Sequence, residues 1–130
     1  MNKQTTVFAM SLRQRIDSFR YAFQGMADLF RSQPNSQFHL AAAVLVVGAG
    51  CWLRLDRSEW TAIILCIALV IALEALNTGL EYLTDLVSPD YHPLAGKAKD
   101  AGAAAVLIAA IGAAIVGLLI FGPKLWARLG

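Results

Sequence analysis

Four polar side chains recur at helical spacing near the middle of the chain: Glu74, Asn77, Glu81 and Asp85. Successive members are three or four residues apart, so a helix would place all of them on one narrow face. Ionisable groups in an apolar segment are costly unless they are paired or face water, and they mark functional sites by default. The alternative to a functional site is that the apolar segment crosses a membrane and that its helix has already emerged into water by Glu81. Acids concentrated on one arc favour a functional site over that alternative.

These side chains indicate two kinds of chemistry. Carboxylates near an aqueous interface suit a hard cation such as Mg²⁺, which takes oxygen ligands and usually shares them with substrate phosphates. Glu74 lies deeper in the apolar segment, where it could accept a proton from an alcohol as a general base. Lys99, next to Asp100, could neutralise phosphate charge. We assign no catalytic role to Lys97, because basic residues mark the cytoplasmic flank of a membrane span whatever the protein does.

The composition indicates that the bilayer is the solvent of this chain. Its 130 residues have a mean hydropathy of +0.58, and only 15% of them are charged. This is too apolar for a soluble domain of that size, and we expect one membrane-integrated domain over residues 1–130. The net charge of +2 is scattered, so we expect no nucleic-acid partner. No short charged start leads directly into an apolar core, so we expect the N-terminus to be retained.

The region 11–33 has the pattern of an amphipathic helix. Its large apolar residues share one helical face and basic residues occupy the others, which predicts a helix lying in the headgroup plane. Packing on a partner protein is the alternative. Pro34 and Asn35 should end this helix. The apolar face consists of Leu12, Ile16, Phe19, Phe23, Met26 and Phe30.

Three apolar segments follow that predict membrane spans over residues 38–55, 60–86 and 94–121. Gly122 and Pro123 should end the third span. This span also carries a small residue at every fourth position, which allows helix backbones to approach closely. Its small residues are Ala105, Ala109, Ala113 and Gly117. The fold class is therefore an all-α membrane protein with a surface helix and three transmembrane helices.

The basic residues set the orientation. Seven of the eleven Lys and Arg residues lie in the N-terminal segment and in the loop at residues 88–100, so both should face the cytoplasm. This predicts a multi-pass protein with a cytoplasmic N-terminus.

Two other functions compete with catalysis. A proton or ion carrier would need polar groups across the whole membrane depth, but the outer half of the second span is apolar apart from Cys66. A non-catalytic oligomeric scaffold would use the small-residue stripe and leave the acids unexplained. His39 and His92 have no second ligand at metal-binding spacing, and no soluble-kinase signature is present.

A longer pattern brings in a family resemblance. E-A-L-N-T-G-L-E-Y-L-T-D from Glu74, followed by Y-H-P-L-A-G-K-A-K-D-A-G-A-A-A-V, resembles the signature of the prokaryotic diacylglycerol kinase and undecaprenol kinase family. S-F-x-x-A-x-x-G from Ser18 and N-S-Q-F-H from Asn35 extend the resemblance over nearly the whole chain. It implies a homotrimeric lipid kinase of the bacterial cytoplasmic (inner) membrane, with active sites between protomers. ATP would be the co-substrate, Mg²⁺ the cofactor and a membrane lipid alcohol the substrate.

The resemblance also implies residue roles. Glu74 would be the general base, Asn77 its neighbouring active-site amide, and Glu81 with Asn35 the metal site. The nucleotide would be contacted by Tyr21, Glu81, Asp85, Lys99 and Asp100. The implied reaction is direct in-line transfer of the γ-phosphate.

One departure from the family pattern concerns the metal site. The diacylglycerol branch has a metal-binding Glu where this chain has Asn35, and Gln33 is also uncharged, so the metal would depend more on Glu81 and ATP. Asn35 with Phe38 and His39, and H-P-L-A from His92, favour undecaprenol over diacylglycerol as the substrate.

Overall fold

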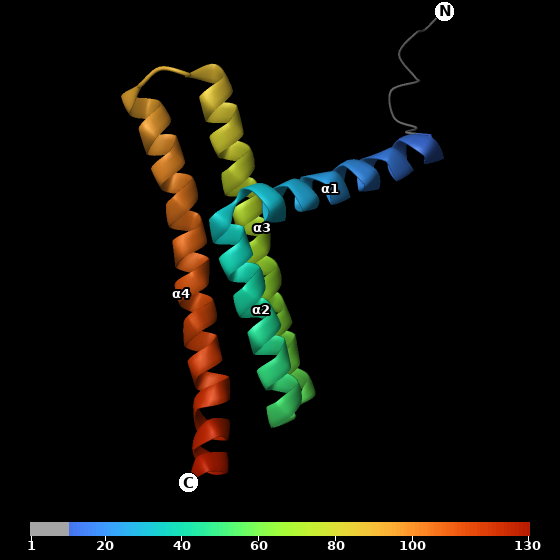
Figure 1. Ribbon diagram of the computed structural model, residues 1–130, viewed down its shortest axis with the longest axis vertical. Helices are drawn as coiled ribbons and strands as arrows, with labels where there is room; N and C mark the ends of the chain where they lie inside the picture. The colour runs from blue at the N-terminus through green and yellow to red at the C-terminus, as the bar shows by residue number, and fades with distance from the viewer. Residues whose placement is uncertain (1–10) are drawn as a thin grey trace, which may run out of the picture.

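The computed structural model describes residues 11–130, and this part of the chain is helical throughout apart from short connections. The helices are α1 (Leu12–Ser32), α2 (Pro34–Leu53), α3 (Arg57–Val87) and α4 (Pro93–Leu129) (Figure 1). The predicted all-α class is confirmed. The last three helices are each long and apolar enough to cross a membrane.

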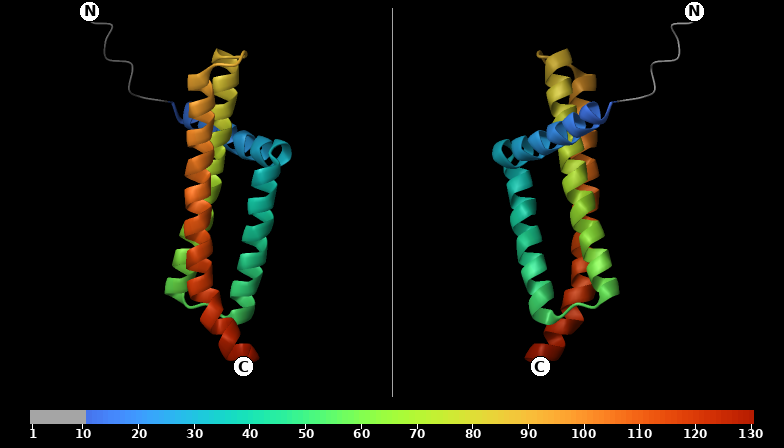
Figure 2. Two further views of the ribbon diagram at one scale, coloured as in Figure 1. Left: turned by 90° about the vertical axis from the view of Figure 1, so that its left-hand side faces the viewer. Right: turned by 90° about the vertical axis from the view of Figure 1, so that its right-hand side faces the viewer.

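Helix α1 projects sideways from the three long helices, which run roughly along one common direction (Figures 1 and 2). Its start is fixed by a capping box: Gln14 donates its backbone N–H to the Ser11 hydroxyl, and the Ser11 N–H donates to the Gln14 side chain. Near its other end Leu29 is buried, whereas Phe19 and Phe23 are exposed. An exposed apolar face of this kind needs lipid or protein to cover it.

A single extended residue separates α1 from α2. Gln33 has φ −109° and ψ 110°, because the ring of the following proline disfavours the helical region for the residue before it. Pro34 then occupies the first turn of α2, where its missing N–H costs nothing. Helix α2 therefore starts at Pro34, four residues before Phe38, where the predicted span begins.

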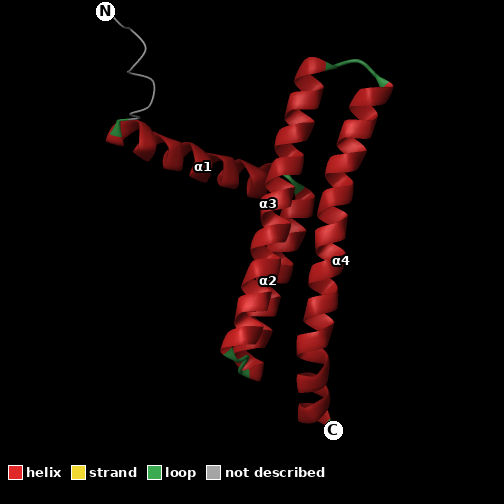
Figure 3. Cartoon of the chain, turned by 180° about the vertical axis from the view of Figure 1, so that it is seen from behind, coloured by secondary structure: helices red, strands yellow, loops and turns green. Residues whose placement is uncertain are grey.

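A tight turn joins α2 to α3 (Figure 3). Arg54 ends α2 in the left-handed region, with φ 55°, and its N–H donates to carbonyls of the last turn. Asp56 caps α3 by accepting from the N–H of Glu59, and the Glu59 side chain accepts in return from the N–H of Asp56.

Helices α3 and α4 are antiparallel neighbours along most of their length (Figures 1 and 3). Most large apolar side chains of the three long helices stay exposed, as lipid-facing or protomer-facing side chains would. The buried apolar side chains are Leu29, Leu53, Leu55, Ile63, Val70, Val106 and Ala109, and the buried polar ones are Ser36, Glu74 and Thr78.

The helix of the third span does not end at Gly122 and Pro123 as predicted, because α4 continues through Pro123 to Leu129. The last turns are held by contacts that do not need the missing proline N–H. Lys124 pairs with Glu59 at 3.1 Å, and the Arg128 guanidinium lies 4.6 Å from the ring centroid of Trp52. Arg128 also donates to the Trp52 carbonyl at 3.1 Å. Contacts with neighbouring helices let a transmembrane helix tolerate an internal proline.

Candidate active site within the helix bundle

Glu74 is a buried carboxylate between α2 and α3, with 4% of the residue exposed. Each of its oxygens meets one polar group of α2. Oε1 lies 3.2 Å from His39 Nε2, and Oε2 accepts from the Ser36 hydroxyl at 3.4 Å. A buried charge is tolerated when such partners replace water. Ser36 and His39 are three residues apart, so both point from the same face of α2.

Asn77 lies one turn further along α3, and only one of its two polar side-chain atoms has a hydrogen-bond partner among the described residues. Its amide group donates to Glu81 Oε1 at 3.1 Å, but its buried Oδ1 has no hydrogen-bond partner within residues 11–130. A buried acceptor without a partner costs free energy, so a donor is expected to reach it in the working protein. Gly102 of α4 lies directly against this oxygen, and a Cβ at that position would collide with it.

These side chains share one cavity of about 270 Å³ between α2, α3 and α4. The polar side is formed by α2 and α3, while α4 contributes apolar side chains such as Val106 and Leu107. The structure thus brings together four of the predicted site residues, namely Asn35, Glu74, Asn77 and Glu81.

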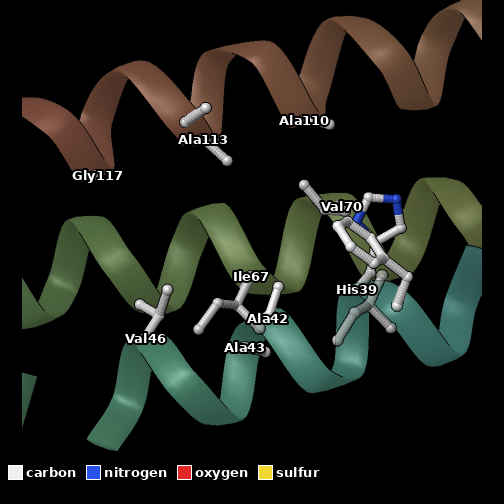
Figure 4. Close-up of a pocket in the computed structure, with 12 residues that line it drawn as sticks. His39, Ala42, Ala43, Val46, Ile67, Val70, Ala110, Ala113 and Gly117 are labelled. Atoms are coloured by element: carbon white, nitrogen blue, oxygen red, sulfur yellow. The ribbon is translucent and has the colours of Figure 1, made fainter. Parts of the chain in front are cut away.

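A second, apolar groove of about 300 Å³ continues from this cavity along the same three helices. His39 and Ala110 line both spaces. Figure 4 shows Ala110, Ala113 and Gly117 of α4 facing α2 and α3 across the groove, with His39 towards one end. Small side chains keep the groove open, and its walls suit a hydrocarbon chain.

The other predicted site residues lie elsewhere. Asp85 forms an ion pair with Lys99, and the two line a separate cavity of about 200 Å³ beside the α3–α4 loop. Tyr21, on α1, is 67% exposed, and Asp100 is exposed on α4. Neither lines either polar cavity.

The donor set around the first cavity fits Mg²⁺ bound together with a phosphate. Residues 11–130 hold no cluster of three or more His, Cys, Asp or Glu side chains able to bind a metal unaided. Mg²⁺ does not require one, since it is usually held by one or two carboxylates plus substrate phosphates. Glu81 and Asn35 supply suitable oxygens, and the unpartnered Asn77 Oδ1 is a further oxygen in the same neighbourhood.

Two residues at the centre of this geometry were not among the predicted site residues. Ser36 is 1% exposed and His39 contacts Glu74, but both entered the prediction only as part of the family motif, with His39 also favouring undecaprenol. Their spacing was the available signal, because polar residues three apart on an apolar helix can meet a polar group on its neighbour.

The fold and the site together define a class: a multi-pass membrane protein with a buried carboxylate in a polar cavity that adjoins an apolar groove. The chain belongs to the prokaryotic diacylglycerol kinase family, which it matches over residues 20–121. It is therefore a lipid kinase, a transferase of lipid metabolism.

Three relatives illustrate its place in the family. The undecaprenol kinase of Bacillus subtilis is 44% identical over 114 residues, which are 88% of this chain and 93% of that protein. A diacylglycerol kinase of Synechocystis is 44% identical over 109 residues, 83% of this chain and 62% of the relative. The diacylglycerol kinase of Escherichia coli K12 is 34% identical over 110 residues, 85% of this chain and 87% of the relative.

Proposed function

We propose that this protein transfers the γ-phosphate of MgATP directly to a membrane lipid alcohol, with undecaprenol preferred over diacylglycerol. The observation that carries the proposal is the position of Glu74: a buried carboxylate that lines the polar cavity, has α2 partners on both oxygens, and contacts His39, which lines both the cavity and the apolar groove. A lipid hydroxyl presented at that junction would keep its hydrocarbon chain in the groove, while the phosphate donor approaches from the polar side.

In the proposed reaction the lipid hydroxyl oxygen forms a bond to the γ-phosphorus. The bond between that phosphorus and the β,γ-bridging oxygen breaks, and its electron pair leaves with ADP. Glu74 accepts the hydroxyl proton, so no phosphorylated protein intermediate forms. A carboxylate has about four lone-pair sites, so two contacts from α2 leave room for this proton.

The remaining polar residues would act on the phosphates. Asn35 and Glu81 would hold Mg²⁺, which neutralises phosphate charge when it is bound. Asn77 would orient Glu81 through its amide group and offer its free oxygen to the metal or to a donor. Lys99, held by Asp85, would face the nucleotide beside the α3–α4 loop, with Asp100 and Tyr21 completing its binding.

The preference for undecaprenol rests on two observations. Of the three relatives described above, the undecaprenol kinase matches over the largest share of this chain. A diacylglycerol kinase reaches the same identity over a smaller share. The groove is lined on α4 by the small residues Ala110, Ala113, Ala114 and Gly117, and the room that they leave suits the single, methyl-branched hydrocarbon chain of a polyprenol.

The assembly and orientation are part of the same proposal. The exposed apolar faces of the three long helices support a homotrimer, in which neighbouring protomers would cover these faces beside the sites. The excess of Lys and Arg around α1 and the α3–α4 loop supports a cytoplasmic location for both, in a bacterial inner membrane, with α1 lying on its surface.

The substrate preference is tested with purified protein in mixed micelles, by comparing kcat/KM for undecaprenol and for diacylglycerol at fixed MgATP. We expect the ratio to favour undecaprenol. A matched variant, Ala113→Leu, narrows the groove and should raise the KM for the preferred lipid with little change in the KM for MgATP. A higher kcat/KM for diacylglycerol would overturn the preference, and transfer to neither lipid would overturn the function.

A further inference from the structure

The inference concerns the side chains that hold Glu74, and it rests on the function proposed above. Among the described residues 11–130, Glu74 has polar contacts only with α2, and it faces apolar side chains of α4 across the cavity, including Val106 and Leu107. Along its own helix, Asn77 and Glu81 bind each other and not Glu74. The orientation of the Glu74 carboxylate is therefore set from α2.

The contact at 3.2 Å requires a proton on His39 Nε2, because a carboxylate oxygen can only accept. His39 thus donates to Oε1 whether its ring is neutral or charged, and its other nitrogen is left for a different partner. With 19% of its side chain exposed, His39 also reaches the edge of the site. Ser36 donates to the other oxygen at the longer distance of 3.4 Å, which makes it the weaker of the two contacts.

We propose that His39 is a positioning residue for the reaction: it orients the Glu74 carboxylate so that a free lone pair faces the lipid hydroxyl. His39 lines both the polar cavity and the apolar groove, so it fixes Glu74 at the point where the hydroxyl must lie. Because it acts through Glu74 and does not itself receive the proton, its loss should lower kcat and leave both KM values nearly unchanged.

Two substitutions separate the hydrogen bond from packing. His39→Phe keeps a planar ring but removes the donor, and should lower kcat about 10- to 100-fold, the usual cost of losing a group that orients a functional one. His39→Gln keeps an N–H at similar reach and should restore kcat to within a few-fold of the wild type. Ser36→Ala, at the longer contact, should have the smaller effect. Equal kcat in His39→Phe and the wild type would overturn the inference, as would a His39→Gln variant no better than His39→Phe.

A second measurement does not depend on activity. The chain has only two histidines, His39 and His92, so protein labelled with ¹⁵N in the histidine rings gives two sets of signals that His39→Gln assigns. In Glu74→Gln the Nε2 signal of His39 should shift, while that of His92, which caps α4, should not.

The two measurements separate the possible failures. If the His39 Nε2 signal does not shift in Glu74→Gln, the contact is refuted and the inference with it, even in a fully active kinase. A wild-type protein that transfers phosphate to no lipid alcohol would refute the proposed function and the positioning role together, even if the contact were present.

Discussion

Gly102 of α4 lies directly against the side-chain oxygen of Asn77 on α3, and no Cβ fits between them. The contact brings α4 against the polar face of α3 next to Glu81, to which Asn77 donates. A larger residue at this position would displace the Asn77 side chain and, through it, Glu81.

The first prediction is that Gly102→Ala lowers the phosphate transfer rate about 10- to 100-fold, because small misplacements in a site are costly. Alanine is otherwise favoured over glycine within a helix by roughly 0.5–1 kcal/mol. The matched control is Gly112→Ala on the same helix, where a Cβ meets no described atom within 4 Å. The control should keep full activity and equal or higher thermal stability. Full activity in Gly102→Ala would show that the Asn77 position is unimportant.

The second prediction concerns the attachment of α1 to the bundle. The Tyr82 hydroxyl on α3 donates to Asp28 on α1 at 2.9 Å and also lies 3.3 Å from the Ser32 hydroxyl. Tyr82→Phe should weaken this attachment by about 1 kcal/mol. Amide hydrogen exchange should then increase in α1 but not in α4. Tyr91→Phe, at a residue that is 92% exposed, is the control, and equal exchange in both variants would contradict the prediction.

The third prediction concerns the helical turns after Pro123. Arg128→Ala removes the contact with the Trp52 ring, worth roughly 0.5–1 kcal/mol at an exposed site, and the hydrogen bond to the Trp52 carbonyl. Amides 124–129 should exchange faster in this variant, whereas Arg15→Ala on α1 should leave them unchanged. Unchanged protection in Arg128→Ala would mean that another interaction holds the end of α4.

The fourth prediction is a pH dependence at the start of α3. The Glu59 N–H and the Ser58 side chain donate to Asp56, and these bonds hold the pKa of that carboxyl below its usual 3.8. A depressed pKa in the folded state stabilises the fold above the unfolded-state value, and this contribution disappears as the pH falls through the folded-state pKa. Asp56→Ala should therefore lower Tm at pH 7, and its difference from the wild type should shrink below about pH 4. A difference that is constant with pH would contradict the role of the charge.

The sequence predicts the helices well because their signals are local. Apolar runs, the acids at helical spacing and the prolines all act within a few residues, which is enough to predict the all-α class. The end of α4 was predicted wrongly for the same reason: Pro123 is a local stop signal, but contacts with Glu59 and Trp52, far away in sequence, outweigh it.

Residue spacing predicts the site only along a single helix, and Asn35 on α2 was added to it by the family resemblance alone. Glu74, Asn77 and Glu81 share a face of α3 by spacing alone, so their proximity follows from the sequence. The contact between His39 and Glu74 depends on how α2 is rotated and shifted against α3, which no local pattern specifies. The same holds for the apolar groove, which exists only once α4 has packed.

The proposed reaction depends on Glu74 accepting the proton of a lipid alcohol during phosphate transfer. The most direct test follows transfer from γ-labelled MgATP to undecaprenol and diacylglycerol by the wild type and Glu74→Gln. Glu59→Gln serves as the matched control: it removes a carboxylate from the opposite end of the same helix, and glutamine can keep the capping contact. We expect transfer by the wild type and by Glu59→Gln, and a loss of transfer rate by several orders of magnitude in Glu74→Gln without loss of folding. Transfer by Glu74→Gln at the rate of Glu59→Gln would contradict this role of Glu74.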